Sequence, residues 1–129
     1  MTDTTPAARA KQLLPLYDDD APIVCTIGGD EKADRIAVMN RMRSEMTSLE
    51  RTDTGLLLQF PRTASIEDDV RRFALDEKRC CQFWGFAVLD SDDELVLRWD
   101  GPPTAGPLLD TLESVLRSDE PIERIEGLL

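Results

Sequence analysis

The sequence of 129 residues contains no histidine, and aromatic residues make up only 5% of it. Without histidine, a Ser-His-Asp or Cys-His catalytic unit and a zinc site built on imidazole ligands are excluded. No run of about 18 apolar residues occurs, so the sequence predicts no membrane-spanning helix. The N-terminal stretch also lacks the apolar core of a secretory signal. We therefore expect a cytoplasmic protein.

Basic residues are also scarce. The sequence has 15 of them against 26 acidic residues, which gives a formal net charge of −11. Such acidity opposes binding to nucleic acid and to anionic membranes. The charge is uneven, with 10 acidic and 8 basic residues in 1–64 but 16 and 7 in 65–129. An acidic half can attract cations or a basic partner, although a surface that simply keeps the protein soluble is the plainer interpretation.

The chain has three cysteines, Cys25, Cys80 and Cys81. In a protein expected in the cytoplasm they predict thiols rather than a disulfide framework.

The composition pattern divides the chain into a flexible N-terminal tail at 1–21, a single domain at 22–117 and an acidic C-terminal tail at 118–129. Apolar residues near the C-terminus offer an alternative in which the last segment docks onto the domain. These residues are Ile122, Ile125, Leu128 and Leu129.

The pattern of apolar and turn residues in the domain predicts the element order β-α-β-β-α-β-β-α. Strands are expected at 22–27, 48–52, 56–60, 86–89 and 94–99. Helices are expected from Asp30, from Thr63 or Ser65 to near Gly85, and from near Thr104 to about Arg117. Short hairpins separated by helices are typical of an α+β fold, with an antiparallel sheet covered by helices on one face. Such an arrangement is related to the ferredoxin-like sandwich.

The helix from Thr63 has the clearest apolar face in the chain, and this face includes a carboxylate. Glu77 precedes Cys80 by three residues and Cys81 by four, which places it on the same helix face as both cysteines. A buried charge is costly unless it is paired, and such exceptions are expected at functional sites. The plainer interpretation is that Glu77 reaches the helix edge and pairs with Lys78, Arg98 or another base.

Three thiols and one carboxylate suit a thiophilic ion such as zinc, copper or mercury. The candidate ligands are Cys25, Cys80, Cys81 and Glu77. Adjacent helical residues diverge by about 100°, so one cysteine of the pair would share an ion with Cys25. The negative end of the helix dipole disfavours a nucleophilic cysteine at this position. The alternative is that the cysteines pack as small core residues.

Aromatic residues flank the cysteine pair. Core packing explains them most simply, and a pocket wall is the alternative. The residues predicted for that wall are Phe73, Phe83, Trp84 and Phe86.

Two short motifs resemble a small, uncharacterised actinobacterial domain that occurs alone or fused to MerR-type regulators. They are the Cys25-Thr-Ile27 start and the Glu77-Lys-Arg-Cys-Cys-Gln-Phe83 segment, followed by Phe86. The resemblance covers roughly residues 22–116, although Gln82 and Gly85 depart from the residues common there. It implies effector or thiophilic-metal sensing, whereas DNA binding is not expected because the chain lacks a helix-turn-helix segment and a basic patch.

Three functions are therefore open. The first is a cytoplasmic module that binds or senses a soft metal or metalloid. The second is a structural or partner-binding module with core cysteines, for which exposed strand edges allow a homodimer. The third, which we favour least, is an enzyme that cleaves organometals, with a buried Glu77 as the proton donor.

Overall fold

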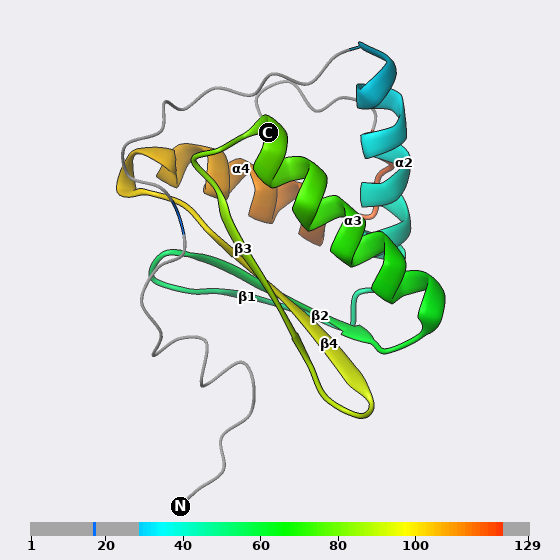
Figure 1. The fold of residues 1–129 in the computed structure, drawn as a ribbon. Coiled ribbons are helices and arrows are strands. Elements are labelled where there is room, and N and C mark those ends of the chain that lie inside the picture. The colour runs from blue at the N-terminus through cyan, green and yellow to red at the C-terminus, as the bar shows by residue number, and fades with distance from the viewer. Residues whose placement is uncertain (1–16, 18–28, 123–129) are drawn as a thin grey trace, which may run out of the picture.

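The computed structural model describes Tyr17 and residues 29–122 (Figure 1). Within this part, three α-helices and one short 3-10 helix alternate with four strands. In chain order they are α2 (Gly29–Glu45), β1 (Ser48–Arg51), β2 (Gly55–Pro61), α3 (Ala64–Cys80), β3 (Gly85–Asp90), β4 (Glu94–Asp100), η1 (Pro103–Ala105) and α4 (Gly106–Arg117).

The four strands form one antiparallel sheet in the order β1-β2-β4-β3. The predicted α+β fold with an antiparallel sheet is therefore confirmed, and both predicted hairpins are present. The strand predicted at 22–27 lies outside the described residues, as does most of the predicted N-terminal tail. None of the helices within the described residues is long and apolar enough to cross a membrane.

Alternation along the strands explains why the helices cover one face of the sheet (Figure 1). The β2 and β4 side chains on that face pack with the helices in the main core. They are Leu56, Leu58, Phe60, Leu95, Leu97 and Trp99. Leu57 and Val96 point to the opposite face, where Leu89 packs against them. The register pairs Leu58 with Leu97 and Leu56 with Trp99, so large apolar residues meet across the two central strands.

Helix α3 begins as the sequence predicted but ends earlier. Thr63 is the N-cap, and its hydroxyl accepts a hydrogen bond from the backbone N–H of Ile66 at 3.3 Å. The predicted end near Gly85 is wrong, because the helix stops at Cys80 and Cys81 leaves helical geometry. Lys78 Nζ donates to the carbonyl oxygens of Gln82 and Trp84, each at 2.7 Å, which stabilises the turn that follows.

Trp84 consequently lies in this turn and not on the helix. Its ring is fully buried and meets the ring of Trp99 edge-on, with centroids 5.5 Å apart.

The segment after α4 docks onto α2 at Ile122. At this residue the structure agrees with the alternative in which the last segment docks onto the domain. Asn40 holds the backbone of Ile122 with two hydrogen bonds of 3.0 Å, one from Nδ2 and one to Oδ1. Ile122 is buried in the main core. Ile125, Leu128 and Leu129 lie outside the described residues.

Candidate functional site

The candidate site lies where α2 and α3 pack against each other. The two helices run in opposite directions, because Arg35 meets Glu77 whereas Arg41, further along α2, meets Asp69 (Figure 1). This arrangement brings the first half of α2 beside the C-terminal turns of α3. The residues predicted as functional at Glu77 and Cys80 are therefore brought against Arg35.

Arg35 and Glu77 form a buried ion pair. Arg35 Nη1 donates to Glu77 Oε1, and the exposed side-chain fractions are 5% and 0%. The interpretation that Glu77 reaches the helix edge is therefore wrong. Its pairing with a base is confirmed, and that base is Arg35 rather than Lys78 or Arg98. Full burial follows from its position on α3, four residues after Phe73 and three before Cys80, both of which face the core.

Burial raises the pKa of Glu77 to about 7, although the nearby charge of Arg35 lowers it. The second carboxylate oxygen, Oε2, has no hydrogen-bond partner among the described residues. Glu77 is thus a carboxyl group that can take up or release a proton near neutral pH inside the core.

Cys80 shares the same guanidinium. Arg35 Nη2 lies 3.7 Å from Cys80 Sγ in a hydrogen bond, and Cys80 is 8% exposed. Burial lowers the pKa of Arg35, but Glu77 and Cys80 outweigh this effect and raise the pKa above its usual value. One cation therefore lies between a buried carboxylate and a buried thiol.

Cys81, the next residue, has a different chemical state. It is fully buried and disulfide-bonded, whereas Cys80 retains its thiol. The expectation of thiols alone is therefore wrong at Cys81. Cys25 lies outside the described residues, and so does its predicted approach to Cys80 or Cys81.

Among the described residues, no group of three or more cysteine, aspartate or glutamate side chains is arranged to hold a metal ion. Glu77 and Cys80 provide two donors, and Arg35 supplies the positive charge between them. The predicted ligand set of Cys25, Cys80, Cys81 and Glu77 therefore stays a prediction.

The aromatic residues predicted for a pocket wall divide between core and surface grooves. Phe83 and Trp84 are buried in the main core, with ring centroids 4.5 Å apart. Phe73 is buried too, yet it lines a groove of about 270 Å³ between α2 and α3 together with Arg35 and Arg72. Phe86 lines a second groove, between α3 and β3. The groove at Phe73 is therefore lined by Arg35, the residue that pairs with Glu77.

The sequence prediction missed Arg35, although a signal was present. Arg35 precedes Val38, Met39 and Met42 by three, four and seven residues, which is the spacing of one helix face. All four side chains are buried in the structure. A base and an acid, each placed on the apolar face of its own helix, form a recognisable pair once the two helices are packed together.

Comparison of this chain with protein-family models, curated proteins and solved structures found no match.

Proposed function

We propose that this chain is a small thiol module that binds or senses a soft metal or metalloid cation. The donor groups in this proposal are Cys25, Cys80, Cys81 and Glu77. The observation that carries it is the shared guanidinium, because Glu77 and Cys80 hold one positive charge between them in the core. Such a site already compensates buried positive charge. A soft cation that displaced Arg35 would find a carboxylate oxygen and a sulfur beside it.

The disulfide at Cys81 adds a redox condition to this proposal. Cys81 is disulfide-bonded in the structure, whereas Cys80 is not. Reduction by a dithiol would transfer two electrons and two protons to this disulfide and leave two thiols. Binding of a soft cation then releases the thiol protons. The reduced chain would bind the ion, and the oxidised chain would not.

The test is a titration of the fully reduced chain with Zn²⁺ and with Hg²⁺ under anaerobic conditions, followed by native mass spectrometry. We expect uptake of one ion per chain by the reduced protein, and no uptake by the oxidised protein or by Cys80→Ala. Asp68→Asn is the matched control, because Asp68 is an exposed acid near the N-terminal end of the same helix, α3. Equal uptake by the reduced wild type and by a variant with all three cysteines replaced by alanine would overturn the proposal.

A second candidate is a structural module in which the cysteines serve packing. The burial of Cys80 and Cys81 within the main core favours it. This candidate predicts that Cys80→Ala changes the unfolding free energy without changing the number of bound ions. The same titration therefore separates the two functions.

A further inference from the structure

The two edges of the sheet differ in how they meet solvent. The edge strand β1 is four residues long and carries Glu50 and Arg51. The other edge, β3, has six residues with an unbroken apolar run from Phe86 to Leu89, and each of these is half-buried. Charges and short length protect an edge strand from pairing with another chain. Within residues 29–122, only the β1 edge has this protection.

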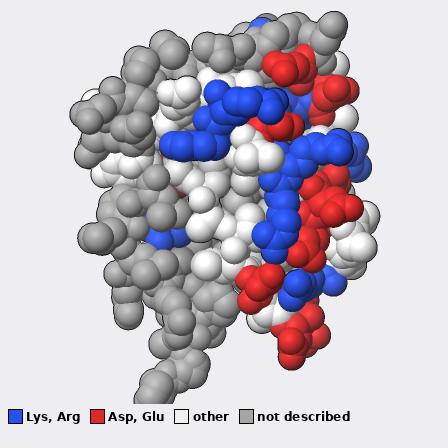
Figure 2. All heavy atoms as spheres, in the orientation of Figure 1, with Lys and Arg blue, Asp and Glu red and all other residues white. Residues whose placement is uncertain are grey.

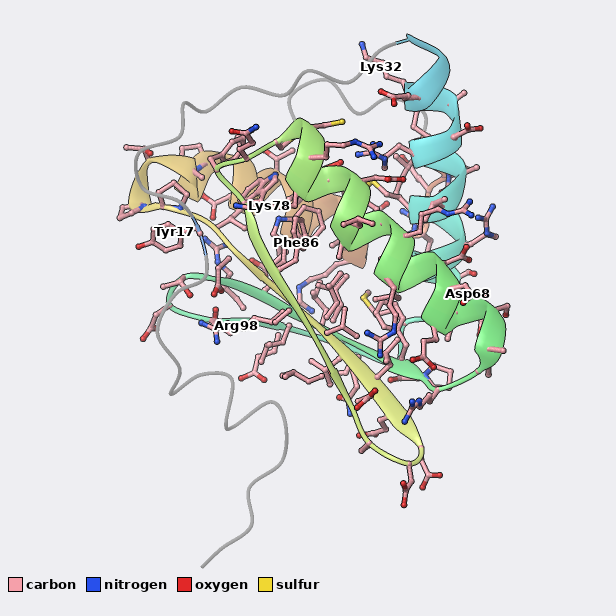
Figure 3. All side chains as sticks on the ribbon, viewed as in Figure 1. Tyr17, Lys32, Asp68, Lys78, Phe86 and Arg98 are labelled. Atoms are coloured by element: carbon pink, nitrogen blue, oxygen red, sulfur yellow. The ribbon has the colours of Figure 1, made fainter. Side chains whose placement is uncertain are left out.

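Beside the β3 edge lies an apolar groove of about 470 Å³ between α3 and β3. Leu75 lines it and is the one large hydrophobic side chain that is exposed among the described residues, at 69%. Basic side chains at the groove bond within the chain, since Lys78 donates to backbone carbonyls and Arg71 pairs with Glu67 and Asp90. Figure 3 shows Lys78 and Phe86 side by side at this edge.

The position of Leu75 along the strand follows from two contacts. Arg71 on α3 reaches Asp90 at the end of β3 at 3.1 Å, and Lys78 reaches the carbonyl oxygen of Trp84, just before β3, at 2.7 Å. Helix and strand therefore run in opposite directions. Leu75 lies between Arg71 and Lys78 on α3, so we infer that it is level with the middle of β3, near Ala87.

We propose that two copies of this chain pair through β3, antiparallel about a two-fold axis at Ala87. Directly opposed residues in an antiparallel pair point to the same face. Phe86 and Val88 both pack toward the helix-covered core, so the register that places Ala87 opposite the partner's Ala87 also places Phe86 opposite the partner's Val88. Aromatic residues opposite β-branched ones are favourable cross-strand pairs. The two α3 helices would then flank the axis on the same face, with Leu75 facing the partner's Leu75.

Charge complementarity supports a second copy as the occupant. The turn between β3 and β4 carries the exposed acids Asp92 and Asp93, whereas the opposite end of this face carries Lys78 and Arg79 of α3. Figure 2 shows an uncharged area with basic atoms above it and acidic atoms below it, bordered on one side by a column of mixed charge. The two-fold rotation places the acidic end of each copy on the basic end of the other. Such an isologous contact closes after two copies.

This inference does not depend on the thiol function. Its test is sedimentation equilibrium of the full chain over a range of concentrations, with the disulfide intact and reduced. We expect a dimer in both states. Leu75→Glu places two like charges at the axis and should weaken dimerisation by about tenfold or more. The exposed Thr111 on α4 gives the control Thr111→Glu, which should leave the dimer unchanged.

An exchange of charges between the two ends tests the same interface if Leu75→Glu perturbs folding. Asp93→Lys should weaken the dimer, and Arg79→Glu added to it should restore the lost affinity. Added salt should weaken the wild-type dimer, because the charged ends are exposed. A wild-type chain that remains monomeric at every concentration overturns the proposal. So does a dimer that Leu75→Glu and Asp93→Lys leave unchanged.

Discussion

Arg35 on α2 forms a buried ion pair with Glu77 on α3, across 42 residues of sequence. The pair fixes how the two helices pack, because each charged side chain is balanced only when the other is present. It also holds the thiol of Cys80 through the second guanidinium nitrogen, at 3.7 Å. Arg35, Glu77 and Cys80 therefore form one cluster, which contains both the buried ion pair and a thiol.

Measured at a pH above 7, where Glu77 is ionised in the wild type, Arg35→Met should lower the free energy of unfolding by about 3–5 kcal/mol, because it removes the counter-charge of the buried carboxyl group. The double variant Arg35→Met/Glu77→Leu should recover most of this loss. Urea denaturation of the wild type and the three variants measures both effects.

Arg41 provides the control for this cycle, since its ion pair with Asp69 lies at the surface. Arg41→Met should cost at most about 1 kcal/mol. A cost for Arg35→Met no larger than that of Arg41→Met would contradict a structural role for the buried pair.

Glu77 should make stability depend on pH. Burial raises its pKa in the folded state to about 7, from 4.5 in the unfolded chain. Between these two values the folded protein retains a proton that the unfolded chain releases, so the unfolding free energy falls as pH rises through this window. The loss amounts to about 3 kcal/mol.

Glu77→Gln removes this titration. The difference in unfolding free energy between wild type and Glu77→Gln should therefore shift in favour of the variant between pH 4.5 and 7. Parallel pH profiles of the two proteins would show that Glu77 does not titrate in this range.

Gly55 should tolerate no side chain. A Cβ atom at this position would lie 1.7 Å from the carbonyl oxygen of Trp99 on the paired strand β4. Gly55→Ala must therefore shift backbone where β2 begins beside the end of β4, and we expect a loss of about 1–3 kcal/mol in unfolding free energy. Gly106→Ala is the control, because a Cβ atom there meets nothing within 4 Å. Similar unfolding midpoints for the two variants would contradict this account.

The cysteines should differ in reactivity. Cys80 is 8% exposed, so the native protein should react slowly with a maleimide, and Cys81 should not react until the disulfide is reduced. Peptide mapping without reduction should recover Cys81 in a disulfide-linked peptide. Rapid labelling of all three cysteines in the unreduced protein would contradict both expectations.

The fold was largely predictable because its signals are local. The two hairpins follow from apolar strands around short polar turns, and Thr63 as N-cap follows from its position before an apolar helical pattern. The end of α3 was not predictable, because the apolar spacing continues through Trp84 although the backbone turns at Cys81. Beyond that end, Trp84 packs against Trp99 in the core.

The site was predictable only in part. Glu77 stood out because a carboxylate interrupts an apolar face, and its burial agrees with that signal. Its partner Arg35 depends on how α2 packs against α3, which no local pattern specifies. The disulfide state of Cys81 likewise depends on contacts between distant segments and on redox chemistry.

The most direct test of soft-cation binding is X-ray absorption at the zinc edge on the fully reduced chain loaded with one equivalent of Zn²⁺. The account predicts a shell of sulfur neighbours at about 2.3 Å, and this shell should lose a sulfur in Cys80→Ala. A zinc ion surrounded only by oxygen and nitrogen atoms, with a spectrum that Cys80→Ala leaves unchanged, would contradict it.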